Sequence, residues 1–162
     1  MCIVIKKTGK DIREDDADDY ILGYTIGNDI SSRYWQRPPR SGGQYCYAKG
    51  FDRFAPIGPV IRSVEATDIT QLRLQTFVNG ELRQDTLTSD LIFNPQQIIA
   101  HLSKGYTLRQ GTVIMTGTPD GIAGRRPDEP WVKPGDVIRV SISYIGHIEN
   151  RMKGPEIVPA LL

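Results

Sequence analysis

Four polar side chains that suit metal-assisted chemistry on an oxyanion lie close together in this sequence. Asp29 ends an apolar run, Arg33 and Gln36 follow within seven residues, and Lys49 comes after a loop rich in proline and glycine. A carboxylate is a hard ligand for a divalent cation, a guanidinium is a forked donor for carboxylates, and an ammonium supplies a point charge. A purely structural interpretation stays open, with Asp29 as a turn residue and Arg33 as a solvated surface charge.

A downstream segment, Thr116-Gly117-Thr118-Pro119-Asp120-Gly121, strengthens the functional interpretation because it follows a predicted buried strand over residues 111–115. The common catalytic motifs are absent: the sequence has no phosphate-binding loop, no Gly-x-Ser-x-Gly, no His-Glu-x-x-His and no Cys-x-x-Cys. His101 and His147 are the two histidines, and their spacing does not support a zinc site. What remains is chemistry with oxygen ligands, or no chemistry.

Bulk composition predicts one soluble domain over residues 1–162. Hydrophobic residues make up 39% and charged residues 24% of the 162 residues, as is ordinary for a globular protein. The net charge of +1 gives no reason to expect a nucleic acid or a membrane as partner. Cys2 and Cys46 form no disulfide framework, so a reducing compartment is expected, and no apolar run is long enough to span a membrane. We therefore expect a cytoplasmic protein.

The N-terminal third predicts short elements around Asp29. Residues 2–5 form an apolar strand with nothing ahead of it to pair with or cover it, which exposes Ile3 and Ile5 to aggregation. The acidic cluster in residues 13–23 predicts a short helix that stops at Gly23. Residues 24–30 predict a buried strand with Asp29 near its end. Two prolines and two glycines in residues 37–46 predict a loop, either a mobile wall of the site or a plain surface connection.

The remainder predicts further strands and one helix. Asn79-Gly80 predicts a hairpin between residues 71–78 and 81–88, because both turn residues must tolerate positive φ. Asn94-Pro95 predicts the start of a helix that ends by Gly105, with Asn94 as the cap. Residues 137–144 alternate, with Tyr144 on the apolar face, and residues 147–152 predict the returning strand.

Several segments, in this order, resemble the C-terminal catalytic domain of the fumarylacetoacetate hydrolase family. The order and spacing hold over nearly the whole chain, so the set is specific although each motif alone is weak. The segments are residues 23–36 around Asp29, 49–59 from Lys49, 78–81 with 90–93, 116–121 around Thr118, and 133–136.

The resemblance implies an α+β, β-rich chain folded as a mixed β-roll with two or three short helices, usually a homodimer, that binds Mg²⁺ or Mn²⁺. Members hydrolyse, decarboxylate or isomerise β-diketo acids and related 2-oxo acids, so a small oxo acid is the expected substrate. By position, Asp29 matches the metal ligand. Arg33, Gln36, Lys49 and Thr118 match residues that contact the substrate, with Lys49 and Gln36 as the catalytic pair.

The chemistry implied by the resemblance is enolate stabilisation. A divalent ion chelated by a 2-oxo carboxylate polarises the carbonyl and stabilises the enolate that remains when a C–C bond breaks. Lys49 adds positive charge at that oxyanion, and Thr118 holds the carboxylate through its hydroxyl or backbone donors.

The chain departs from the family pattern at its start. The family's Glu-x-Glu pair, which completes the metal site, and the upstream lid with its His–Glu pair have no counterpart here, and Lys6 stands where glycine is common. Because one carboxylate binds Mg²⁺ poorly, we expect weak or no metal affinity. We therefore expect residues 1–162 to be a family domain without its N-terminal part. A mitochondrial location is expected if the true start of the gene lies upstream.

Two hypotheses follow, and a third is weaker. The chain is a metal-dependent enzyme acting on C–C bonds of oxo acids, or it is a non-catalytic member that binds a small carboxylate or only dimerises. The retained Asp29, Arg33, Gln36, Lys49 and Thr118 favour the enzyme, whereas the missing acidic pair favours the binder. An unrelated β-rich interaction module would leave the ordered motifs unexplained.

Overall fold

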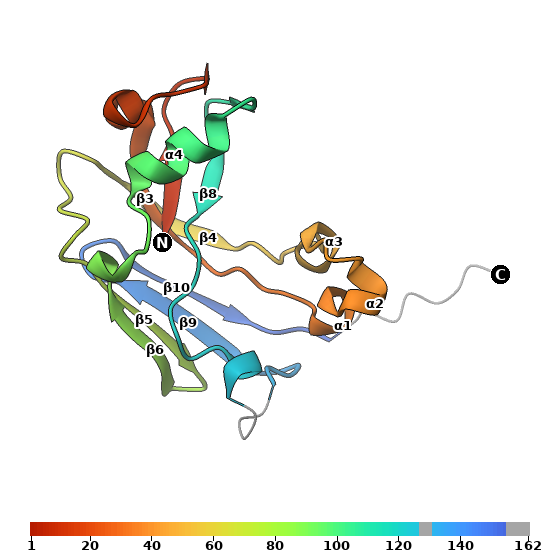
Figure 1. Ribbon diagram of the computed structural model, residues 1–162. Coiled ribbons are helices and arrows are strands. Elements are labelled where there is room, and N and C mark those ends of the chain that lie inside the picture. Colours follow the sequence, from red (N-terminus) through yellow and green to blue (C-terminus); the bar gives the residue numbers. More distant parts are fainter. Residues whose placement is uncertain (127–130, 155–162) are drawn as a thin grey trace.

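The computed structural model describes residues 1–126 and 131–154, and within them two four-stranded sheets form the body of the chain (Figure 1). All strand pairings in the described part are antiparallel. The first sheet has the order β4-β3-β1-β8, the second β10-β9-β5-β6, and β2 pairs with β7. The strands are β1 Cys2–Ile5, β2 Gly9–Lys10, β3 Ile21–Gly27, β4 Ile57–Ser63, β5 Arg73–Val78, β6 Glu81–Leu87, β7 Thr107–Leu108, β8 Val113–Met115, β9 Val137–Ile142 and β10 Gly146–Arg151.

The first strand lies inside the first sheet. β1 pairs with β3 on one side and with β8 on the other, and Ile3 and Ile5 are fully buried. The prediction of a strand was therefore correct, but the prediction that it is uncovered was wrong. The sequence pattern shows an apolar run and cannot show that two strands distant in sequence flank it.

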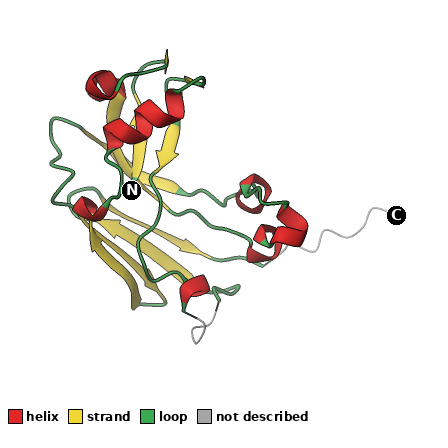
Figure 2. Cartoon of the chain, viewed as in Figure 1, coloured by secondary structure: helices red, strands yellow, loops and turns green. Residues whose placement is uncertain are grey.

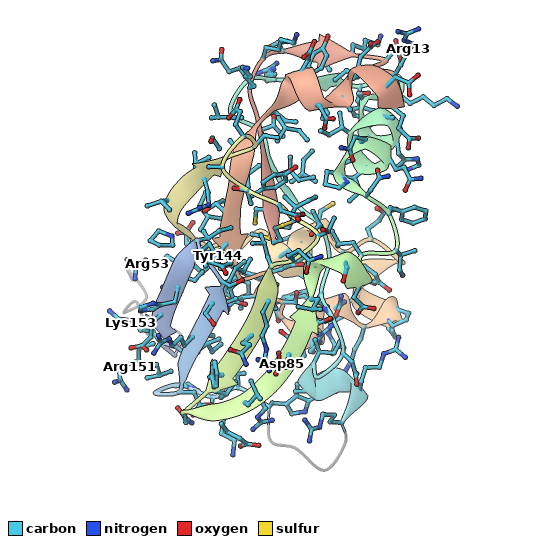
Figure 3. The ribbon with its side chains drawn as sticks, turned by 90° about the vertical axis from the view of Figure 1, so that its left-hand side faces the viewer. Arg13, Arg53, Asp85, Tyr144, Arg151 and Lys153 are labelled. Atoms are coloured by element: carbon cyan, nitrogen blue, oxygen red, sulfur yellow. The ribbon has the colours of Figure 1, made fainter. Side chains whose placement is uncertain are left out.

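The second sheet contains the predicted hairpin. β5 and β6 pair antiparallel around Asn79 and Gly80, whose φ angles of 51° and 84° are the positive values that the turn requires. β9 and β10 continue the sheet, and Ile138, Val140 and Ile142 of β9 are buried, as the alternation predicted. Tyr144 was misassigned: β9 ends at Ile142, and Tyr144 lies in the following turn with 75% of its surface exposed (Figure 3).

Helix α4 is the longest helix among the described residues, and it begins as predicted. The Asn94 side chain accepts a hydrogen bond from the Gln97 N–H at 2.7 Å, and the Gln97 side chain accepts from the Asn94 N–H at 3.1 Å, which forms a capping box. α4 and η1 lie beside each other at the outer end of the first sheet (Figure 2). The helical segments are α1 Arg33–Gln36, α2 Pro38–Ser41, α3 Cys46–Lys49 and α4 Pro95–Ser103, with 3₁₀ turns η1 Glu14–Tyr20, η2 Thr88–Asp90 and η3 Ala123–Arg125.

Two of the element boundaries predicted near Asp29 differ in the structure. The acidic cluster forms η1, but the helix ends at Tyr20, and Gly23 lies inside β3 where an added Cβ would fall 2.2 Å from the carbonyl oxygen of Arg62. Gly23 is thus required by the close approach of two strands instead of by a helix stop. β3 ends at Gly27, so Asp29 follows the strand instead of lying within it.

The segment predicted as a loop, residues 37–46, contains the short helix α2 and the first residue of α3. Pro38 occupies the first turn of α2, where a proline needs no N–H partner, and Gly42 ends it with a φ of 57°. Aromatic edges hold the neighbouring turns together: ring centroids of Trp35 and Tyr47 lie 5.0 Å apart, and those of Tyr47 and Phe51 lie 5.3 Å apart. Side-chain packing therefore orders a stretch whose composition alone indicates a loop.

The described residues confirm the α+β, β-rich class. One apolar core connects the two sheets with α4 and η1, and it includes Ile3 of β1, Ile26 of β3, Leu74 of β5, Ile99 of α4 and Ile142 of β9. No helix in the described part of the chain is long and apolar enough to cross a membrane.

Candidate active site

A lysine–aspartate pair forms the centre of the candidate site. The Lys49 ammonium donates to Asp29 Oδ2 at 2.5 Å and to Ser31 Oγ at 2.8 Å. The side chains of Asp29 and Lys49 keep 45% and 35% of their surface exposed, so solvent and a ligand can reach both. The structure thus brings together two of the residues predicted from sequence and adds Ser31, which the sequence analysis did not single out.

Backbone hydrogen bonds position this pair. The Ile30 N–H donates to the Phe54 carbonyl at 3.0 Å, which fixes the chain just after Asp29. The Ser32 N–H donates to the Ala48 carbonyl at 2.9 Å, which ties the start of α1 to α3 beside Lys49. These bonds join two segments that lie 20 residues apart, and they place the ammonium over the carboxylate.

Arg33 and Gln36 form a second pair on α1. The Arg33 Nη1 donates to Gln36 Oε1, so the guanidinium and the amide are oriented by each other. Both residues are half-buried, and the backbone bond from Ser32 to Ala48 connects their helix to α3. A Cβ added at Gly124 would lie 3.9 Å from Arg33 Cζ, so the guanidinium lies against η3, the 3₁₀ turn that follows Thr118 in the chain.

Thr118 is exposed and held from β6. Gln84 Nε2 donates to Thr118 Oγ1 at 2.9 Å and to the Pro119 carbonyl at 3.0 Å. The Gln84 amide is itself fixed, because its Oε1 accepts from Thr76 Oγ1 at 2.8 Å. Since Thr118 Oγ1 accepts this bond, its own O–H is free to donate to a bound oxygen. Gln84 is a second residue that the sequence analysis missed, since only the β5–β6 pairing brings it to this loop.

The predicted residues therefore form two contacting pairs and one separate hydroxyl. Within the described part of the chain, no hydrogen bond or ion pair joins Thr118 directly to Lys49 or Arg33, although η3, which follows Thr118, reaches Arg33. The side-chain donors near Asp29 include Asn28, whose Nδ2 is buried without a hydrogen-bond partner. An unpaired buried donor costs about 1–3 kcal/mol, so an acceptor atom bound there would be stabilised.

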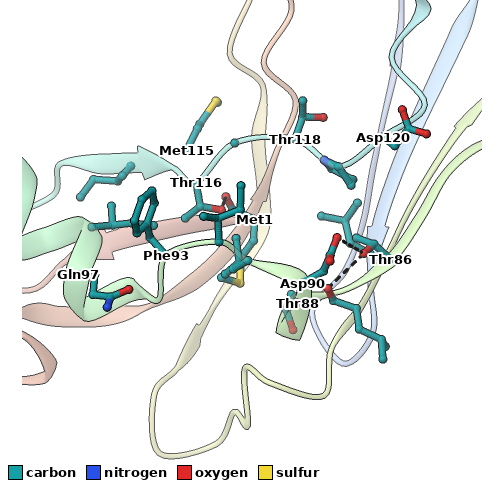
Figure 4. Close-up of a pocket in the computed structure, with 18 of the residues that line it drawn as sticks. Met1, Thr86, Thr88, Asp90, Phe93, Gln97, Met115, Thr116, Thr118 and Asp120 are labelled. Carbon is teal, nitrogen blue, oxygen red and sulfur yellow. Dashed lines mark hydrogen bonds between the residues drawn. The ribbon is translucent and has the colours of Figure 1, made fainter. Parts of the chain in front are cut away.

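An open groove lies on the other side of Thr118 (Figure 4). Its volume is about 910 Å³, and its walls come from β8 and the following loop, α4, residues 91–93 and Met1. Asp29, Lys49, Arg33 and Gln36 are not part of its lining, whereas Thr118 is. Thr118 thus belongs both to the candidate site and to the groove wall.

Asp29 also affects a buried thiol. Burial raises the pKa of Cys2 above its usual value, and the charge of Asp29 acts in the same direction. A Cβ added at Gly27 would lie 2.4 Å from Cys2 Sγ, which shows how closely β1 passes the end of β3. Cys2 is therefore an inert core thiol at neutral pH.

Comparison with known proteins identifies the family. Residues 1–153 match the family model described as "Fumarylacetoacetate (FAA) hydrolase C-terminal". The chain belongs to the fumarylacetoacetate hydrolase family. Among solved structures, fumarylacetoacetate hydrolase from psychrophilic Exiguobacterium antarcticum is 39% identical with a TM-score of 0.87, and the match covers 95% of this chain and 55% of that one. The family-type fold inferred from sequence is thereby confirmed.

Relatives of this chain within the family are named for different reactions. "Oxaloacetate tautomerase fahd2, mitochondrial" from Xenopus laevis is 39% identical over 93% of this chain and 47% of its own length. A maleylpyruvate hydrolase from Sphingobium sp. SYK-6, solved in complex with manganese(II) ion and pyruvate, is 30% identical with a TM-score of 0.80, covering 96% of this chain and 53% of that one. The chain spans about half the length of the relatives that it matches.

The manganese in that relative raises the question whether the residues of this chain fit a divalent ion. Across residues 1–126 and 131–154, no group of three or more His, Cys, Asp or Glu side chains could hold a metal. Asp29 is the one carboxylate in the site, and it is paired with Lys49. Mg²⁺ and Mn²⁺ need several oxygen ligands, so these residues alone do not fit a resident ion. The donors near Asp29 suit an anionic oxygen better.

Proposed function

We propose that this chain forms a catalytic domain of the family, acting on 2-oxo or β-diketo acids at a C–C bond or by isomerisation. The observation that carries the proposal is the half-buried Lys49 ammonium, held by Asp29 and Ser31, on a helix that a backbone bond ties to the helix of the Arg33–Gln36 pair. The names of the relatives support it, because tautomerases of oxaloacetate and a hydrolase of maleylpyruvate both act on 2-oxo acids.

The common chemical step is formation of an enolate. When a bond at C3 of a 2-oxo acid breaks, its electron pair delocalises onto the 2-oxo oxygen, which becomes negatively charged. Lys49 is the proposed catalytic residue, since an ammonium beside that oxygen stabilises the charge more than it stabilises the neutral ketone. Asp29 and Ser31 hold the ammonium in place.

The remaining residues are proposed to bind the substrate. Arg33 offers a forked donor to a carboxylate, and Gln36 offers its amide N–H groups because its oxygen already accepts from Arg33. Thr118 donates its hydroxyl proton to a carboxylate or oxo oxygen, with Gln84 fixing the hydroxyl. We propose Asp29 as a ligand for Mg²⁺ or Mn²⁺ only together with oxygens from the oxo acid, because the described residues do not complete a metal site.

Solvent deuterium exchange tests the proposed function without knowledge of the exact reaction. Pyruvate is incubated with the protein in D₂O, with and without Mn²⁺, and loss of its methyl proton signal is followed by NMR. We expect protein-dependent exchange, lost in Lys49→Met and kept in Arg73→Met, which removes a surface cation that pairs with Asp85 (Figure 3). Exchange at the same rate in Lys49→Met would refute the assigned role.

A second candidate function is a non-catalytic carboxylate-binding protein. The single carboxylate in the described site favours it, because the described residues alone do not complete a metal site, whereas the maleylpyruvate hydrolase relative was solved in complex with manganese(II) ion. Calorimetry distinguishes the two: this candidate predicts that pyruvate binds and that no exchange occurs under any metal condition.

Assembly and location are further proposals. We propose a homodimer in the cytoplasm, and light scattering after size exclusion measures the first directly. A mass of one chain, 18.1 kDa, would contradict the dimer. The name of the Xenopus relative includes a mitochondrial location, which belongs to that protein.

A further inference from the structure

Strand β6 is an edge strand of the second sheet, and a bulge interrupts its pairing with β5. Thr76 of β5 lies opposite Gln84 of β6. The next residue of β5, Phe77, lies opposite Leu82, so Arg83 is the extra residue of the bulge. A bulge bends its strand and re-aims the groups beside it, and bulges are over-represented next to active sites. The edge of β6 is thus redirected at Arg83 and Gln84.

The loop that carries Thr118 packs directly on this bulge. A Cβ added at Gly121 would lie 1.9 Å from the carbonyl oxygen of Arg83, so only glycine allows the two backbones to approach this closely. The φ of Gly121 is 102°, a value that glycine adopts without strain. Because Gly121 follows Thr118 by three residues, this contact fixes the end of the loop against the second sheet.

The Gln84 side chain fixes the middle of the same loop. Its Nε2 donates to the Pro119 carbonyl at 3.0 Å and to Thr118 Oγ1 at 2.9 Å. A carbonyl only accepts hydrogen bonds, so the Pro119 contact determines which end of the amide faces the loop. The other end, Oε1, accepts from Thr76 Oγ1 at 2.8 Å. A directed chain of hydrogen bonds therefore runs from Thr76 through Gln84 to Thr118.

This chain of hydrogen bonds determines the polarity of the Thr118 hydroxyl. Since Thr118 Oγ1 accepts from Gln84, its own O–H remains as a donor. In residues 1–126 and 131–154, no group accepts a hydrogen bond from that O–H. The hydroxyl is thus held as a donor for an oxygen that accepts, such as that of a carboxylate or a ketone.

We infer that the β5–β6 hairpin is part of the active site, with Thr76 and Gln84 as positioning residues that act on the substrate only through Thr118. The bulge at Arg83 is the platform on which the Thr118 loop rests. Holding the donor in place before the substrate arrives lowers the entropy that binding must spend. The inference rests on the proposed function, because that function assigns Thr118 to the substrate.

The kinetics of deuterium exchange into pyruvate test this positioning role. A contact that is equally strong in the bound substrate and in the enolate changes KM and leaves kcat unchanged. Gln84→Met removes the amide at similar size and should raise KM by about fivefold, as expected for one net hydrogen bond. Thr76→Val should raise KM by about two- to threefold, and Thr76→Ser, which keeps the hydroxyl, should restore it. Gln75→Met is the matched control without effect, because that amide contacts Asp85 instead of the loop.

A double-mutant cycle shows whether the effect passes through Thr118. In a protein that already carries Thr118→Val, Gln84→Met should raise the KM for pyruvate by less than about twofold, because the hydroxyl that Gln84 orients is gone. Additive effects of the two substitutions would overturn the inference, since Gln84 would then affect the site by another route.

The packing of the loop on the bulge is tested without any activity. Gly121→Ala should speed the hydrogen exchange of the backbone amides of residues 117–121, measured by NMR, by at least about tenfold relative to Gly135→Ala. Gly135 has a similar φ of 95°, but no atom lies within 4 Å of a Cβ added there, so it controls for backbone strain alone. Gln84→Met should speed the same amides and replaces Gly121→Ala if that variant does not fold. Equal exchange in these variants and in Gly135→Ala would overturn the platform role of the bulge.

The outcomes separate the two proposals. If deuterium exchange is lost in Lys49→Met while Gln84→Met keeps its KM, the positioning role is overturned and the proposed function stands. If the unmodified protein neither binds pyruvate nor exchanges its protons, the proposed function is overturned, and the action of Gln84 on a substrate with it. The amide measurement decides the platform role in either case.

Discussion

At the scale of single residues, the Asp29–Lys49 pair contributes more to chemistry than to stability. Both side chains are more than a third exposed, and exposed ion pairs contribute about 0–1 kcal/mol. The Arg73–Asp85 pair has the same N–O distance of 2.5 Å on the outer sheet surface, so it provides a built-in comparison. If the Asp29–Lys49 pair serves function, breaking it should lower activity, whereas breaking the Arg73–Asp85 pair should not. The effects of the two changes on stability should be similar.

The first prediction concerns Asp29. Asp29→Ala should abolish metal-dependent turnover of a 2-oxo acid, because the proposed ligand and the partner of Lys49 are both lost. The free energy of unfolding, measured in urea, should fall by less than about 1 kcal/mol. Asp85→Ala should show a similarly small stability change with full turnover. Unchanged turnover in Asp29→Ala would rule out the ligand assignment.

Sequence analysis predicted five residues of the candidate site and did not name two that orient them in the structure. Asp29, Lys49, Arg33, Gln36 and Thr118 were predicted by position in family motifs. Ser31 and Gln84 were not, because a hydroxyl and an amide are common residue types whose roles depend on contacts across the fold. The signal for Ser31 was its place two residues after Asp29, whereas Gln84 had no local signal.

At the scale of elements, local chemistry predicted turns and caps better than it predicted boundaries. The Asn79-Gly80 hairpin and the Asn94 cap were correct because each depends on neighbouring residues alone. The loop prediction for residues 37–46 was wrong in part because aromatic packing between Trp35 and Tyr47 orders the surrounding turns. Such packing joins residues that a local pattern treats separately.

The second prediction tests the cap of α4. Asn94→Ala removes the acceptor for the Gln97 N–H and should cost about 1 kcal/mol. The melting temperature should fall by about 2–4 °C, as expected for a protein of this size. Asn94→Asp keeps an acceptor at the cap and should melt close to the original protein. Equal losses in both variants would mean that the cap is not the source of the stability.

At the scale of the whole molecule, β1 is the element that the sequence described least well. The sequence predicted an uncovered apolar strand at residues 2–5, yet this strand lies between β3 and β8 with Ile3 fully buried. Its partners are about 20 and about 110 residues away in the sequence, and pairings at such distance leave no local trace. The fold class was implied by the resemblance to the family, whereas no local pattern predicted the order of the strands in the sheets.

The third prediction measures the importance of β1 to the core. Ile3→Ala should lower the free energy of unfolding by about 2–5 kcal/mol, because a buried isoleucine leaves a cavity. Ile92→Ala removes the same atoms from a side chain with 89% of its surface exposed, and its effect should stay within about 0.5 kcal/mol. Similar losses in both variants would contradict the central place of β1.

The central claim is that Lys49, beside Asp29, stabilises the enolate of a 2-oxo acid, and oxalate is a stable mimic of that enolate. The most direct measurement is a calorimetric titration of oxalate in the presence of Mn²⁺, on the unmodified protein, Lys49→Met and Arg73→Met. We predict that oxalate binds to the unmodified protein and to Arg73→Met. The oxalate affinity of Lys49→Met should fall by at least about tenfold, since removing a charged donor from an oxyanion costs more than about 1.4 kcal/mol. Mn²⁺ should bind only weakly without oxalate. Equal oxalate affinity in Lys49→Met, or no oxalate binding to the unmodified protein, would contradict the account.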